Sequence, residues 1–139
     1  PGDAPGYCHR AVVAQELSAV TAACMVTWRR LYLELGGLNV RWLPVAFNDV
    51  DYCLRVRRAG FRVVFTPHAR LYHHESVSRG QDRGWRQQLR AWGEVRYMRW
   101  KWRREMRHAP FYNPNFSYLR PDFALGPAPN VQRPWRGQG

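Results

Sequence analysis

The sequence lacks any hydrophobic run long enough to cross a membrane, and it lacks paired cysteines. A membrane-spanning helix needs roughly 20 consecutive apolar residues, whereas the longest apolar stretches here, residues 19–26 and 63–65, are strand-sized. The three cysteines, Cys8, Cys24 and Cys53, form no CxxC pair, which argues against a disulfide framework and a structural zinc site. We therefore expect a reducing, cytoplasmic setting.

Isoleucine is absent and lysine nearly so: Lys101 is the single lysine among 22 basic residues, which face 10 acidic residues and give a net charge of +12. Such a charge attracts nucleic-acid backbones. The preference for arginine and valine is also what GC-rich codons produce, so a nucleic-acid partner is the weaker interpretation. With 45% hydrophobic and 14% aromatic residues, the 139-residue chain can fold around one core and is not a disordered chain.

Residues 1–82 have the pattern of an α/β unit. After an irregular lead-in over residues 1–7, the predicted elements are a buried strand at 19–26, a helix at 28–35 capped by Thr27, a helix at 47–59, a strand at 62–65 and an extended piece at 69–72. Glycines end both helices, at Gly36 and Gly37 and at Gly60. The order strand, helix, helix, strand predicts the α/β class.

Residues 83–109 predict one long amphipathic helix. Its apolar residues recur at steps near 3.6 and are Trp85, Leu89, Trp92, Val95, Trp102 and Met106. We expect this stripe to pack against the preceding unit and the arginines to face solvent. Residues 110–139 are rich in proline, asparagine and aromatic residues without periodicity, which predicts an extended tail without a helix.

Two acidic residues open the second predicted helix. If Asn48 caps it, Asp49 and Asp51 lie in the first turn, where free amides and the helix dipole stabilise carboxylates. Asp51 precedes Arg55 by four residues, which favours a structural ion pair. Asp49 has no basic residue three or four positions later, so it is free to point into a cleft as a catalytic carboxylate.

A second candidate cluster follows the predicted strands. His73 and His74 stand beside Glu75 and suit divalent-metal binding, although two solvated surface histidines are the commoner arrangement. Ser78 and Arg79 precede Gly80, a combination that suits anion binding, because a glycine turn exposes amides and arginine grips phosphate.

Four motifs follow one another in the order GGLN, DVDYCLR, GFR and PHARLYHHES, and AVTAACMV precedes them. This succession, over residues 19–80, resembles the C-terminal half of the catalytic domain of glycosyltransferase family 2 enzymes, which build bacterial surface polysaccharides. FYNPNFS in the tail is similar to bacterial members of the same family. The resemblance implies the second half of a GT-A domain, Rossmann-like with a mixed sheet, followed by the amphipathic helix over 83–109 and the tail over 110–139.

The resemblance also implies inverting transfer of a sugar from a nucleotide-sugar donor to a saccharide or lipid-linked acceptor. Asp49 matches the family's base, and His73, with His74 as the alternate, matches a ligand of Mg²⁺ or Mn²⁺. The residues implied to bind or line the substrates are Thr21, Ala22, Gly36, Gly37, Asn48, Asp51, Ser78 and Arg79. Asn48 stands where many members carry another acid. The nucleotide-binding half and its DxD motif are missing, so we expect a piece of a longer protein that is inactive alone.

Two alternatives use the arginine-rich helix at 83–109. One is nucleic-acid binding, with arginines on phosphates and aromatic residues stacked on bases. The other is contact with a membrane surface, with tryptophan toward acyl chains and arginine toward anionic lipid. The second is compatible with a glycosyltransferase that works at the inner face of a membrane.

Overall fold

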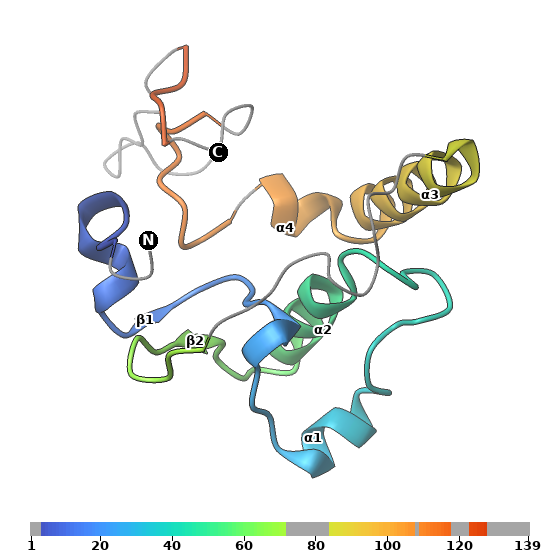
Figure 1. The fold of residues 1–139 in the computed structure, drawn as a ribbon, viewed down its shortest axis with the longest axis horizontal. Coiled ribbons are helices and arrows are strands. Elements are labelled where there is room, and N and C mark those ends of the chain that lie inside the picture. The colour runs from blue at the N-terminus through green and yellow to red at the C-terminus, as the bar shows by residue number, and fades with distance from the viewer. Residues whose placement is uncertain (1–3, 72–83, 108, 118–122, 128–139) are drawn as a thin grey trace, which may run out of the picture.

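The computed structural model describes residues 4–71, 84–107, 109–117 and 123–127. Its elements in chain order are η1 (Tyr7–Val12), β1 (Gln15–Glu16), η2 (Ala22–Cys24), α1 (Arg29–Glu34), α2 (Asn48–Arg58), β2 (Val64–Phe65), α3 (Trp85–Lys101) and α4 (Arg103–Arg107) (Figure 1). The described part is mainly helical with one small sheet, which is compatible with the α/β class. None of the helices in these ranges is long and apolar enough to span a membrane.

Helix α2 is the centre of the described fold, because it contributes to two hydrophobic clusters. Tyr52, Cys53 and Val56 pack with Leu31 of α1 and with Val63. On its other side Leu54 packs with Leu43, Met98 and Trp102. α2 therefore lies between α1 and α3, as Figure 1 shows, and the position of each neighbour is set by one face of α2.

The buried carboxylate of Asp51 joins α2 to the end of α3. The side chain has no exposed surface, and it accepts hydrogen bonds from Arg55 Nε at 2.9 Å, Lys101 Nζ at 2.7 Å and Trp102 Nε1 at 2.8 Å. The predicted pair with Arg55 is confirmed. A second ion pair, Arg58 with Glu105 at 2.8 Å, connects the end of α2 to α4.

The sheet consists of two antiparallel strands, with Gln15 opposite Phe65 and Glu16 opposite Val64. The strand predicted at residues 62–65 is confirmed in its second half, whereas its partner β1 and the helix η1 lie in a segment for which we predicted no element. Residues 69–71 form no strand, and Tyr72 lies outside the described residues.

The strand predicted at residues 19–26 is wrong. Residues 22–24 form a 3₁₀ turn, and Thr21, Ala22 and Cys24 are exposed. Local hydrogen bonds explain the difference: the Ala23 amide donates to Thr21 Oγ1 and the Ala22 amide donates to Asp49. Amides satisfied by nearby side chains are not available to a strand ladder.

The two predicted N-terminal caps are also wrong. Trp28, not Thr27, occupies the N-cap position of α1 and makes no side-chain cap hydrogen bond, and the Thr27 hydroxyl lies 2.9 Å from the Tyr52 hydroxyl. Phe47, not Asn48, precedes α2, with a left-handed φ of 63°, so Asn48 is the first helical residue. The glycine stop after α1 is confirmed, because Gly36 and Gly37 have φ of 75° and 64° and glycine adopts such angles without strain.

α3 packs on the opposite face from the one we predicted, and the long helix is interrupted at Trp102. Its buried residues are Glu94 and Met98, and the Glu94 carboxylate accepts hydrogen bonds from the Val45 and Ala46 amides at 3.0 and 3.3 Å. Of the predicted stripe, Trp102 is buried and Val95 half-buried, whereas the exposed members are Trp85, Leu89, Trp92 and Met106. Polar anchors, not the apolar stripe, orient this helix.

The described part of the tail packs against the N-terminal segment. Tyr7 stacks on Phe123 with ring centroids 4.5 Å apart, and Phe116 meets Tyr7 edge to face at 5.8 Å. Phe116 and Leu125 form an antiparallel bridge. Residues 109–117 and 123–127 contain no helix, which confirms that prediction for these ranges.

Replacing Asp51 by Asn is expected to lower the free energy of unfolding by about 3 kcal/mol, because it leaves the Lys101 and Arg55 charges without their buried partner. Urea denaturation at neutral pH measures this. The matched control is Glu34→Gln, which breaks the exposed pair with Arg30 and is expected to cost no more than about 0.5 kcal/mol. Equal losses in the two variants would contradict the role of Asp51.

The same carboxylate makes stability sensitive to acid. Burial by itself would raise the pKa of Asp51, but hydrogen bonds from Lys101, Trp102 and Arg55 outweigh it and place the pKa below its ordinary value. A lowered pKa stabilises the fold above the unfolded-state value, near about 4, and that stability is lost as the pH falls through the folded-state pKa. The difference in urea midpoint between wild type and Asp51→Asn is expected to shrink steadily below about pH 4. A constant difference would contradict this assignment.

Candidate functional site

The N-terminal turn of α2 brings together predicted site residues that are far apart in the sequence. Asp49, the second residue of α2, accepts a hydrogen bond from the Ala22 amide to Oδ2 at 3.1 Å. Its Oδ1 accepts one from the Val50 amide at 2.8 Å. Asp49 is half-buried, while Thr21 and Ala22 are exposed. The small-residue segment therefore lies beside Asp49 in the structure.

The backbone turn before α2 aims this carboxylate. Phe47 is in the left-handed region, which is uncommon for a bulky residue and is often found at functional sites. This turn places the Asp49 carboxylate beside η2, at the end of α2 whose free amides favour negative charge. No basic side chain in the described ranges pairs with Asp49. Among the described residues, its hydrogen-bond donors are the backbone amides of Ala22 and Val50.

Asp51 lies on the opposite side of the same helix, because residues two apart differ by about 200° around the axis. With its three donors and no exposed surface, it stabilises the fold and offers no atom to a substrate in this conformation. Asp51 therefore has the structural role, an ion pair with Arg55, that its spacing in the sequence favoured. Asn48 is half-buried at the first turn.

Gly36 and Gly37 lie on the Asp51 side of α2. The Gly37 carbonyl accepts a hydrogen bond from Arg55 Nη2 at 2.6 Å, and the Leu35 carbonyl accepts another from Arg55 Nη1. Gly36 lines a small hollow of about 360 Å³ together with Asn39, Arg41, Arg55 and Lys101. The predicted substrate residues within the described ranges thus divide into two groups, one at Asp49 and one at this hollow.

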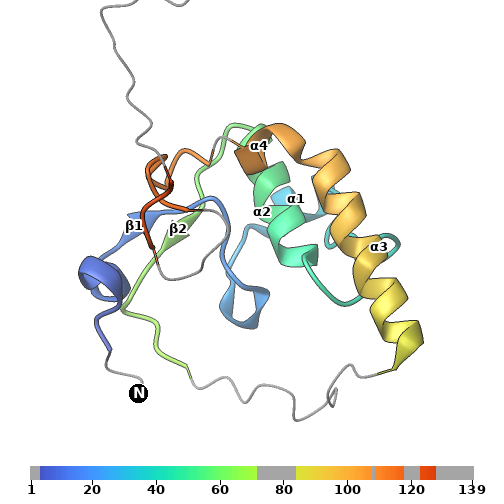
Figure 2. The same cartoon turned by 90° about the horizontal axis from the view of Figure 1, so that it is seen from above.

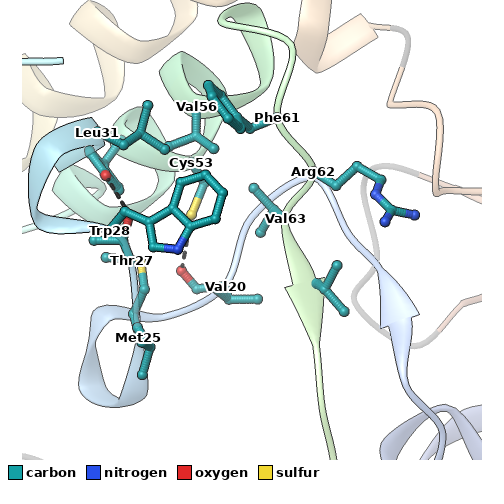
Figure 3. A pocket seen from close by; sticks show the side chains of 13 residues that line it. Val20, Met25, Thr27, Trp28, Leu31, Cys53, Val56, Phe61, Arg62 and Val63 are labelled. Atoms are coloured by element: carbon teal, nitrogen blue, oxygen red, sulfur yellow. Dashed lines mark hydrogen bonds between the residues drawn. The ribbon is translucent and has the colours of Figure 1, made fainter. Parts of the chain in front are cut away.

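A pocket of about 480 Å³ opens between residues 20–31, α2 and residues 61–64 (Figure 3). Its walls are mostly apolar, and Trp28 meets Phe61 edge to face with ring centroids 5.9 Å apart. Cys53 lies in the wall one helical turn after Asp49 and donates to the Val20 carbonyl at 3.7 Å. Asp49 itself does not line this pocket. Sequence reasoning missed it, because its walls come from three separate segments.

The metal prediction falls on residues that the structure does not describe. His73, His74, Ser78 and Arg79 lie within residues 72–83, outside the described ranges. Within those ranges, no group of three or more histidine, cysteine, aspartate or glutamate side chains is arranged to hold a metal ion. The described residues around Asp49 do not by themselves form a divalent-cation site.

Comparison with known proteins relates this chain to several bacterial proteins. It is 47% identical over 125 residues to the uncharacterized protein y4gI of Sinorhizobium fredii, a match that covers 90% of this chain and 14% of that protein. It is 44% identical over 64 residues to the O-antigen biosynthesis protein RfbC of Myxococcus xanthus, covering 46% of this chain and 5% of that protein.

A third relative is the N-acetylglucosaminyl-diphospho-decaprenol L-rhamnosyltransferase of Mycobacterium tuberculosis. The identity is 30% over 63 residues, which is 45% of this chain and 20% of that enzyme. The chain therefore spans a minor part of the length of each of these relatives. No family model matches the chain, and no solved structure is similar to it. Part of the chain is thus related to proteins named for glycosyl transfer and polysaccharide biosynthesis.

The three cysteines are expected to differ in their reactivity toward a thiol reagent. Cys53 is buried, and burial raises the pKa of its thiol, whereas Cys8 and Cys24 are exposed. Because the thiolate is the reactive form, Cys53 should be labelled at least about tenfold more slowly near neutral pH. Mass spectrometry of each cysteine after timed labelling measures this, and addition of urea should equalise the rates. Equal rates in the folded protein would show that the pocket wall does not bury Cys53.

Proposed function

We propose that this chain is the acceptor-side part of a glycosyltransferase with a family 2, GT-A type catalytic domain. In this proposal, Asp49 is the general base in an inverting transfer from a nucleotide-sugar donor. The observation that carries the proposal is the position of Asp49, half-exposed at the start of α2 and fixed by the amides of Ala22 and Val50. The partial similarity to proteins named for glycosyl transfer supports the reaction class.

Inverting sugar transfer requires a general base whose carboxylate is ionised, positioned and accessible to the acceptor. Each Asp49 carboxylate oxygen accepts one hydrogen bond from a backbone amide, and each can accept a further hydrogen bond. The base removes the proton of the acceptor hydroxyl while that oxygen attacks the anomeric carbon from the side opposite the leaving nucleoside diphosphate. The bond to the diphosphate breaks, and the configuration at the anomeric carbon inverts.

The remaining site residues receive supporting roles. Thr21 and Ala22 border Asp49 and, as small side chains, let substrate approach the backbone closely. Ser78 and Arg79 would contact the diphosphate. A bound Mg²⁺ or Mn²⁺ would neutralise the charge on the leaving diphosphate; His73 or His74 would contribute one ligand, with further ligands from outside the described residues. Gly36 and Gly37 lie on the Asp51 side of α2, so they would contact only a part of the acceptor that extends away from Asp49.

The acceptor is proposed to be a saccharide or a lipid-linked saccharide. One relative is named for transfer to N-acetylglucosaminyl-diphospho-decaprenol, which is a lipid-linked acceptor. We place the reaction on the cytoplasmic side of a membrane, where nucleotide sugars are available.

Asp49→Asn in the full-length protein is expected to lower kcat for sugar transfer by about 10²- to 10⁴-fold, the usual contribution of a positioned base. Donor affinity should remain within about twofold, because the amide keeps the size of the side chain. Nucleoside diphosphate release in the presence of Mn²⁺, across a panel of nucleotide sugars, measures the first quantity, and calorimetric donor titration measures the second.

The matched control is Glu34→Gln, which makes the same carboxylate-to-amide change at an exposed position on α1 and should leave kcat unchanged. Full turnover by Asp49→Asn would refute the base assignment while keeping the reaction class. Failure of the wild-type protein to bind any nucleotide sugar would refute the class itself.

A further inference from the structure

Helix α3 presents a row of large apolar side chains to solvent. Trp85, Leu89, Trp92 and Trp100 are 66%, 61%, 63% and 76% exposed. They recur at intervals of three, four or eight residues, which places them on one face of the helix. We call this row, together with Arg96 and Arg99 between its members, the outer face of α3. α3 lies at the edge of the molecule, with α2 along its inner side (Figures 1 and 2).

The exposure of the outer face is fixed by the contacts that residues on the opposite side of α3 make. Glu94 accepts hydrogen bonds from the amides of Val45 and Ala46. Met98 is packed in the core, and Lys101 donates a hydrogen bond to Asp51. Rotating α3 to bury its tryptophans would expose Met98 and break all of these polar contacts. The outer face therefore stays uncovered by the described part of the chain.

The apolar surface continues from α3 onto the neighbouring loop. Trp42 is 57% exposed and stacks on Tyr97 with ring centroids 5.6 Å apart. Between this pair and Trp100 runs an open groove of about 930 Å³, whose cationic lining side chains include Arg41, Arg96 and Lys101. Trp42 and Trp100 thus border one continuous aromatic and basic surface.

The charged side chains that α3 exposes on this surface are all arginines. Arg86, Arg96 and Arg99 are exposed along α3, and the Arg86 and Arg96 guanidinium groups lie 5.2 and 5.5 Å from the ring centroids of Trp85 and Trp92. Glu94 is the single acidic residue of α3, and it is buried. The outer face therefore combines large amphipathic rings with positive charge that no acidic side chain of α3 neutralises at the surface.

We propose that the outer face of α3 binds the surface of an anionic phospholipid bilayer. Tryptophan rings prefer the interface between headgroups and acyl chains, and arginines beside them bind lipid phosphates. A second copy of the chain is a poor occupant, because it carries the same net charge of +12 and repels the first. This inference does not depend on the proposed sugar transfer, since lipid binding can be measured without a donor.

The test measures binding of the full-length protein to vesicles of phosphatidylglycerol and phosphatidylcholine, and to vesicles of phosphatidylcholine alone. The wild type is expected to sediment with the anionic vesicles at low salt, and to do so less as salt is raised. Trp92→Ala with Trp100→Ala, and separately Arg96→Glu with Arg99→Glu, should each weaken this binding at least about tenfold. The controls are Trp28→Ala and Arg29→Glu, which alter exposed residues at the start of α1 and should change it less than about twofold.

Four results would overturn the proposal. One is absence of binding to anionic vesicles, and another is equal weakening by the controls. The third is tighter binding to a single-stranded oligonucleotide that the same α3 variants abolish, which would make the face a nucleic-acid site. Circular dichroism and thermal unfolding of each variant establish that it is folded. A large loss of stability in the Trp92→Ala, Trp100→Ala variant would also count against the proposal, because it would show that protein covers this face.

Discussion

The described fold depends on one buried carboxylate. Asp51 has no contact with solvent and is neutralised by Arg55 and Lys101, with the Trp102 indole as a third donor. An isolated charge in such a position would be strongly unfavourable, so the helix that carries Asp51 and the helix end that carries its partners have to meet in one arrangement. Arg55 extends the constraint, because it also binds the carbonyls of Leu35 and Gly37 and so fixes the loop after α1.

This constraint determines what the molecule presents on both sides of α2. Because Asp51 points toward α3, Asp49 points away from it and toward Ala22. Because Lys101 and Glu94 are anchored inward, the tryptophans of α3 point outward. A candidate site and a candidate membrane surface, on different helices, thus follow from the same set of polar contacts.

The sequence predicted those features that have local causes. The bounds of α2 to within one residue, the glycine stop after α1, the Asp51–Arg55 pair and the lack of a helix in residues 109–117 and 123–127 all depend on residues within a few positions of each other. The face of α3 was predicted wrongly because its anchors, Val45, Ala46 and Asp51, lie about 50 positions away and leave no periodic signal. The pairing of β1 with β2 involves two residues on each side, too few for a strand pattern to be recognised. The contact between the Ala22 amide and Asp49 joins residues 27 positions apart, and neither periodicity nor charge indicates it.

The two carboxylates of α2 show how surroundings assign different roles to one residue type. Asp51 has cations within 3 Å and no exposed surface. Its carboxylate therefore stabilises the fold and is not accessible to a substrate. Asp49 is one half-turn away but is held by two neutral amides and remains partly exposed. A base must be ionised before the reaction and must accept a proton during it; pairing with cations keeps a carboxylate ionised but makes it a weaker base. Of the two, Asp49 alone is partly exposed and has no cationic partner among the described residues, which is the physical reason why we propose Asp49, and not Asp51, as the base.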